Sequence, residues 1–168
     1  MRVRRVLLML LAALLAVGVL SARTAGAKGG HPKGPPPRSG DSRVEIVLWL
    51  SSRGRTGKVD IKKLWDGYNN CVKDDATNPG QVDAPSIFAT PSLNIVHLSV
   101  TARGGVFEDC GYETSKMHWR LSGRLGETAE VQLSSYGGSV TASCGPKDPR
   151  WDCSKAGTGN VLYISTQG

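Results

Sequence analysis

Four cysteines constrain the fold of this 168-residue chain more than any other feature. Its N-terminal segment predicts export to an oxidising compartment, where cysteines form disulfides. Residues 1–5 are short and basic, residues 6–20 carry no charge, and residues 25–27 are the small sequence Ala-Gly-Ala. This succession is typical of a secretory signal peptide, which we expect over residues 1–27. A membrane-spanning helix would need about 20 apolar residues. The sequence therefore predicts a secreted, extracellular protein with no membrane span in its mature chain.

An exported chain with an even number of cysteines normally forms disulfides. Four cysteines allow three pairings, and we favour Cys71 with Cys110 and Cys144 with Cys153. The second pair closes a short loop that contains Gly-Pro and Asp-Pro turn sequences. In the chain-entropy model these two crosslinks stabilise the fold by roughly 4 and roughly 3 kcal/mol. The cysteine spacings match no standard zinc pattern, so we expect neither a metal nor a cofactor.

The formal net charge of +7 resides mainly near the N-terminus. Residues 28–43 read KGGHPKGPPPRSGDSR, rich in Gly and Pro, with more bases than acids and no large apolar side chain. We expect a disordered basic arm there. Residues 44–168 contain equal numbers of basic and acidic residues, and we expect them to form a single disulfide-stapled domain. Because no clustered basic footprint stands out, the sequence does not favour a nucleic-acid partner.

One segment has the spacing of an amphipathic helix, which we expect from Asp60, the candidate N-cap, to Lys73. The apolar residues at helical intervals are Ile61, Leu64, Trp65, Tyr68 and Val72. Residues 74–92 contain three prolines and read as a long loop.

The remaining patterns are those of β-strands. Residues 44–50 are apolar on both faces, through Val47 and Trp49 as well as Leu48 and its neighbours, which is typical of a central strand. Alternating runs follow from residue 93 onward, with glycines between them. We predict a mainly β (α+β) fold: a small antiparallel sandwich or open barrel of about six strands with one amphipathic helix and two disulfides.

Catalysis has one concrete candidate in this sequence. His97 and His118, with Glu108 and Arg120, have the chemistry for general acid–base cleavage of a phosphodiester, as in small secreted ribonucleases. If their two strands paired across the intervening loop, however, the histidines would be offset by about five residues, or roughly 17 Å. Both also fall on predicted solvent faces. The absence of a recognisable catalytic set favours a non-enzymatic protein.

Aromatic side chains in loops are the usual anchors of protein interfaces. Tyr112, Tyr136 and Trp151 lie in or beside predicted loops, and Trp151 would be held by the Cys144–Cys153 crosslink. Arg150 and Trp151 are the contact residues that the sequence favours most. The alternative is that Trp151 folds back over an open end of the sheet.

These observations favour a secreted binding protein that acts outside the cell on a protein or a surface polymer. It would be of the inhibitor or host-directed effector type found among virulence factors. Two alternatives remain open at the level of sequence. One is a small secreted hydrolase, such as a ribonuclease that uses His97 and His118. The other is a structural component of a wall or coat.

Overall fold

A computed structural model describes residues 36–64, 71–89, 92–105, 110–156 and 160–167. All of them belong to one compact unit of the chain. The predicted signal peptide lies outside these residues. So does the first part of the predicted arm.

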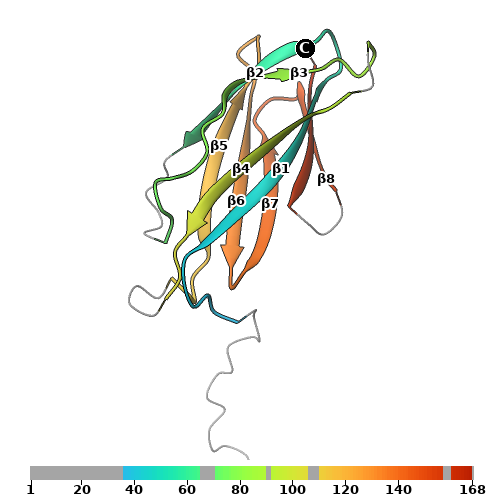
Figure 1. Cartoon of the computed structure of the whole chain (residues 1–168). Coiled ribbons are helices and arrows are strands. Elements are labelled where there is room, and N and C mark those ends of the chain that lie inside the picture. Colours follow the sequence, from blue (N-terminus) through green and yellow to red (C-terminus); the bar gives the residue numbers. More distant parts are fainter. Residues whose placement is uncertain (1–35, 65–70, 90–91, 106–109, 157–159, 168) are drawn as a thin grey trace, which may run out of the picture. The chain divides into compact units, whose positions relative to one another are not determined.

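Nine strands make up the described fold, and they form two sheets (Figure 1). Sheet A has the order β4-β1-β9-β8, and sheet B has the order β3-β2-β5-β6-β7. All neighbouring strands are antiparallel except β1 and β9, which run parallel. The strands are β1 Ser42–Ser52, β2 Gly57–Leu64, β3 Gly80–Ala84, β4 Asn94–Ala102, β5 Ser115–Ser122, β6 Thr128–Tyr136, β7 Ser139–Pro146, β8 Trp151–Ala156 and β9 Val161–Thr166.

The core lies between the two sheets, because alternate side chains of each strand point to the same side. In β1, Ile46, Leu48 and Leu50 are fully buried, while the residues between them are partly exposed. In sheet B, Trp119 and Leu121 of β5 pack into the same cluster. The two sheets thus form a β-sandwich, in which β4 and β1 lie in front of sheet B in Figure 1.

The mainly β prediction is confirmed, and β1 is an inner strand of its sheet as expected. The structure adds three strands to the six predicted ones: β2, β3 and β8. The predicted helix is wrong over Asp60–Leu64, which belongs to β2, and over residues 71–73, where Val72 forms an isolated β-bridge with Ala102. Val59 and Ile61 point into the core from β2, so the alternation of strand residues prevails over the helical spacing. Trp65 and Tyr68, also assigned to that helix, lie outside the described residues.

Both predicted disulfides are present. Cys144 of β7 joins Cys153 of β8, so this crosslink connects sheet B to sheet A. Cys71 joins Cys110 and connects the segment before β3 to the segment before β5. Two disulfides fit an oxidising environment. Within the described part of the chain, no helix is long and apolar enough to cross a membrane.

The predicted disordered arm needs a correction at its C-terminal end. Arg38 is only 7% exposed, and Ser42 and Arg43 already belong to β1. The burial of Arg38 arises from contacts with distant segments that the local composition does not reveal.

Candidate binding surface

Three large apolar side chains line up across the outer face of sheet A. Trp49 of β1 pairs with Ile95 of β4 on one side and with Tyr163 of β9 on the other. The rings of Trp49 and Tyr163 meet edge to face, with their centroids 4.6 Å apart and their planes at 82°. This geometry is favourable for aromatic pairs. We call Ile95, Trp49 and Tyr163 the apolar row.

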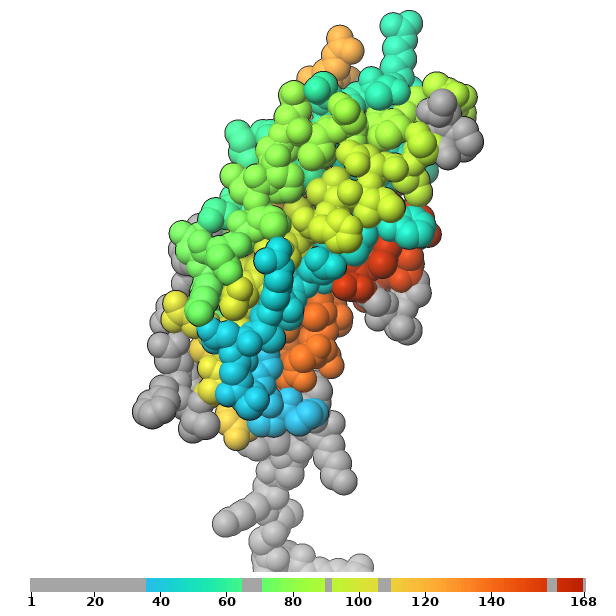
Figure 2. Space-filling view, in the orientation of Figure 1, coloured from blue at the N-terminus to red at the C-terminus, as the bar shows by residue number. Residues whose placement is uncertain are grey.

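The apolar row points away from the core. Ile95 is 55% exposed, Tyr163 is 37% exposed and Trp49 is half-buried. Val47, two residues before Trp49, is also half-buried on this face. Figure 2 views the molecule from this side, in the orientation that places β4 and β1 in front. Exposed apolar patches of this kind mark interaction sites in soluble proteins.

Strand β4 lies at the edge of sheet A, and only part of this edge is covered. Ser99 and Thr101 exchange hydrogen bonds with the segment 71–77. The N–H and C=O groups of Ile95 and His97 point to the same side of β4 as those of Ser99 and Thr101, away from β1, because the backbone groups of alternate residues in a strand face the same neighbour. Among the described residues, none pairs with those groups. The apolar row therefore ends at a strand edge that can accept a further strand.

The contact residues favoured by the sequence do not form one surface. Trp151 is 2% exposed and belongs to the core, so its prediction as an exposed anchor is wrong. As the first residue of β8, it points inward between the two sheets. Tyr112 is 57% exposed, and Tyr136 is half-buried at the end of β6. Tyr136 lies beside the first residue of β7, whereas Arg150 follows the last. The Nε and Nη2 of Arg150 donate to Oδ1 and Oδ2 of Asp148, at 2.8 and 2.6 Å.

The candidate catalytic residues are separated as well. His97 points outward from sheet A, and His118 points outward from sheet B, so they lie on opposite faces of the sandwich. Their strands do not pair, because β4 pairs with β1 while β5 pairs with β2 and β6. Arg120 lies on the same face as His118, and Glu108 lies outside the described residues. The two histidines therefore cannot act on one substrate group.

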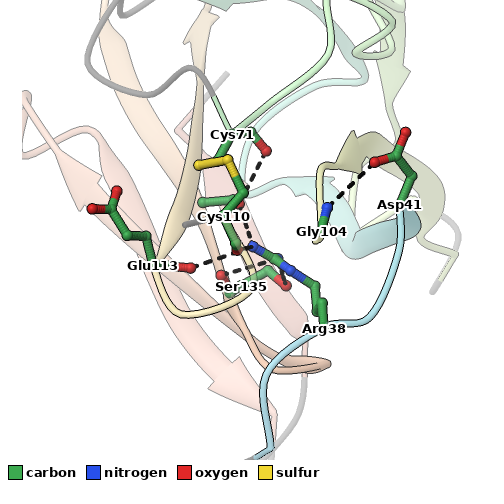
Figure 3. The surroundings of a disulfide bond; sticks show 8 residues. Arg38, Asp41, Cys71, Gly104, Cys110, Glu113 and Ser135 are labelled. Carbon is green, nitrogen blue, oxygen red and sulfur yellow. Dashed lines mark hydrogen bonds between the residues drawn. A yellow bond between two sulfur atoms is a disulfide. The ribbon is translucent and has the colours of Figure 1, made fainter. Parts of the chain in front are cut away.

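Arg38 occupies a buried cage beside the Cys71–Cys110 disulfide (Figure 3). Its Nη2 donates to the carbonyl oxygen of Cys110 at 2.8 Å, to that of Glu113 at 3.3 Å and to Ser115 Oγ at 2.7 Å. Its Nη1 donates to the carbonyl oxygen and to Oγ of Ser135, at 3.3 and 3.1 Å.

The partners of the Arg38 side chain are neutral oxygens, and burial lowers the pKa of the guanidinium. The neighbouring backbone is closely packed, since a Cβ on Gly104 would lie 2.2 Å from the carbonyl oxygen of Gly40. The cage thus anchors the chain before β1. We assign it a structural role, because both Nη atoms already bind protein oxygens.

Other shifted groups are explained by single neighbours at the surface. Hydrogen bonds from Arg150 lower the pKa of Asp148 to about 2, and Asp148 in turn raises the pKa of Arg150. A hydrogen bond from Lys73 lowers the pKa of Asp41. Thr101 lowers the pKa of Asp75 in the same way. Each shift reports a local contact, and none of these groups lines a described cleft.

Sequence reasoning missed the apolar row, although Trp49 and Val47 carried its signal. Apolar residues on both faces predict a central strand, and β1 is one. They do not reveal that the face with Val47 and Trp49 meets solvent. Within the described ranges, no group of three or more His, Cys, Asp or Glu side chains has the arrangement of a metal site.

Comparisons with protein-family models, with curated proteins and with solved structures gave no match.

Proposed function

We propose that this protein is a secreted, non-enzymatic binding protein that recognises an extended segment of another protein at the β4 edge of sheet A. The observation that carries this proposal is the apolar row, which ends at backbone groups of Ile95 and His97 that pair with no described residue. Main-chain hydrogen bonds would give affinity, and the adjacent side chains would give specificity. Action outside the cell, as an inhibitor or host-directed effector, rests on the predicted signal peptide and on the oxidising environment that two disulfides suggest.

The surroundings of the edge limit the chemistry of the partner. A strand added beside β4 would place one side chain next to Ile95 and one next to His97 on the outer face. The first position favours an apolar residue. The second favours a polar residue, because His97 Nδ1 lies 3.4 Å from Glu45 Oε1. We therefore expect a partner segment in which apolar and polar residues alternate on this face.

Two substitutions test the β4 edge and the apolar row separately. His97→Pro removes an exposed N–H donor at an edge position where proline fits a strand, and it leaves all three side chains of the apolar row in place. Trp49→Ala removes the centre of the apolar row. For a partner recovered from the protein's native surroundings, we expect each to weaken binding by about 2 kcal/mol or more, as measured by calorimetry. Gln132→Ala, on the outer face of sheet B, is the matched control and should leave affinity unchanged.

Amide exchange locates the contact independently of the substitutions. A bound partner should protect the amides of Ile95 and His97 and leave those of β6 unchanged. Equal binding by His97→Pro, Trp49→Ala and the unaltered protein would overturn the proposed site. RNA hydrolysis that is lost in both His97→Ala and His118→Ala would contradict a non-enzymatic role.

A further inference from the structure

The outer face of sheet B is polar and carries more bases than acids, in contrast to the apolar row of sheet A. Its strands alternate between core residues and exposed or half-buried polar residues. The acidic side chains on this face are Asp60, Asp83 and Glu130. The basic side chains on this face are Lys58, Lys62, Lys116 and Arg120. The adjoining turns add the bases Arg124, Lys147 and Arg150 and the acids Glu127 and Asp148.

Two open clefts lie on this face. The larger has a volume of about 550 Å³ and is lined by Lys58, Asp60, Gln81 and Arg124, among others. We call it the turn cleft, because it adjoins the turn between β5 and β6. The smaller, of about 250 Å³, crosses β5, β6 and β7. We call it the histidine cleft, and its lining includes His118, Glu130, Gln132 and Lys147.

A charged row separates the two clefts. Lys62 of β2 pairs with Arg120 of β5, which in turn pairs with Glu130 of β6. Ser122 in the turn cleft and His118 in the histidine cleft are four residues apart on β5, or about 13 Å. A ligand that reached both clefts would therefore pass over Arg120 and would have to be a polymer of several units.

Lys62 is paired with Asp60 at 3.2 Å, whereas Arg120 and Lys147 remain able to bind an anion. Arg120 and Lys147 each lie 3.7 Å from Glu130, which is too long for a direct hydrogen bond. Their donors can therefore turn to an external carboxylate or sulfate. Gln132 and Glu130 offer oxygen acceptors to hydroxyl groups at the same place.

We propose that the outer face of sheet B binds an acidic polysaccharide, with its anionic groups at Arg120 and Lys147 and its hydroxyl groups at Glu130 and Gln132. Carboxylates among the bases suit a sugar chain, because their oxygens accept hydrogen bonds from its hydroxyl groups. The described lining of the two clefts includes no Phe, Tyr or Trp side chain on which a nucleic-acid base would stack. This site is separate from the β4 edge of sheet A.

Calorimetry with defined oligosaccharides tests the proposal on the protein made with its own N-terminal segment in a host that forms disulfides. The probes are a heparin hexasaccharide, hexagalacturonate and the neutral cellohexaose. We expect at least one acidic probe to bind, and we expect its affinity to fall as salt rises from about 50 to about 300 mM. The paired substitution Arg120→Gln with Lys147→Gln should weaken that binding about tenfold or more.

The control Lys155→Gln removes one positive charge from an exposed residue of β8, in sheet A. It should change affinity less than about twofold. Trp49→Ala should leave sugar binding intact, so failure here and failure of the proposed β4 site are distinguishable. The proposal is overturned if neither acidic probe binds, if cellohexaose binds equally well, or if a short single-stranded RNA binds as tightly. Equal weakening by Lys155→Gln would also overturn it, because that result would indicate non-specific attraction.

Discussion

Arg38 shows how one residue joins distant parts of this chain. Its donors bind oxygens of Cys110, Glu113, Ser115 and Ser135, which are contributed by the segments before β5, by β5 itself and by β6. A buried charge is costly unless hydrogen bonds replace its water shell. Neutral oxygens do so for both Nη atoms of Arg38, while its buried Nε has no partner among the described residues. The planar fork of arginine reaches several acceptors at once, which a lysine ammonium cannot do from one position.

Arg38→Ala is expected to lower the free energy of unfolding by about 2–4 kcal/mol, because it leaves several buried acceptors unpaired. Arg38→Lys should lower it by more than about 1 kcal/mol, since one ammonium cannot satisfy all of them. Urea unfolding followed by circular dichroism measures both effects. Arg55→Ala, at an exposed arginine, is the control and should stay within about 0.5 kcal/mol. A similarly small effect for Arg38→Ala would refute the anchoring role.

The burial of Arg38 was not predictable from its neighbours in sequence. The surrounding residues are Gly, Pro, Ser and Asp, which indicate disorder, and no large apolar side chain accompanies them. The acceptors that bury Arg38 lie as far as 97 residues away in the chain. The prediction that Trp151 is exposed was wrong for a related reason. The inward direction of its side chain depends on the register of β8 against β9.

At the scale of elements, the segment 71–77 covers one half of the β4 edge, and no other part of the described chain pairs with the second half. Lys73 and Thr77 donate backbone hydrogen bonds to carbonyl oxygens of Thr101 and Ser99. Asp75 accepts from the backbone N–H of Thr101 at 3.0 Å and from its hydroxyl at 2.5 Å. The hydroxyl contact is the main cause of the lowered pKa of the Asp75 carboxyl.

This lowered pKa predicts an acid-sensitive contribution to stability. The folded-state pKa of Asp75 lies below its unfolded value of about 3.9, so the contribution is complete above that value and is lost as pH falls through the folded pKa. Asp75→Asn should reduce the free energy of unfolding at about pH 6 by less than about 1 kcal/mol, because Asp75 is exposed and water screens the interaction.

Urea unfolding at about pH 6 and about pH 2 measures the effect, and the difference between wild type and Asp75→Asn should shrink at the lower pH. Asp83→Asn, at an exposed aspartate of β3, is the control. A constant difference at both pH values would contradict the assignment of this contribution to the Asp75 carboxylate.

Strand β2 shows the limit of periodicity at this scale. Ile61 fits both a helix that continues through Leu64 and a strand that includes Val59. Hydrogen bonding with β3 on one side and β5 on the other decides in favour of the strand. The short β3 and β8 were missed because each carries few core residues: only Ala84 of β3 and Trp151 of β8 are fully buried.

At the scale of the whole molecule, the sandwich presents two outer faces of different chemistry. The apolar row occupies one, and the two polar clefts occupy the other. The Cys144–Cys153 disulfide joins the sheets along the side formed by β7 and β8. The crosslink therefore helps to hold the layers together, and Cys144 also lines the histidine cleft.

Removal of this crosslink by Cys144→Ala with Cys153→Ala should lower the free energy of unfolding by about 3 kcal/mol in the chain-entropy model. Amide exchange should increase in β7 and β8 more than in β2 and β3, because the lost disulfide joins β7 to β8. Denaturant unfolding and exchange mass spectrometry measure these effects. Removal of Cys71 and Cys110 is the comparison, and it should loosen the segment 71–77 and the Arg38 cage instead. Uniform exchange changes in both variants would contradict this division.

The sequence by itself determined the mainly β character and six of the strands, because alternation is a local property of the chain. It favoured the correct disulfide pairing among three possible ones, which the structure then decided. Only the tertiary structure decided which residues share a surface. Register across neighbouring strands brings Ile95, Trp49 and Tyr163 into one row, and the layering of the sheets places His97 and His118 on opposite faces. Such placement depends on contacts between residues far apart in the chain, so the local pattern of apolar and polar residues does not encode it.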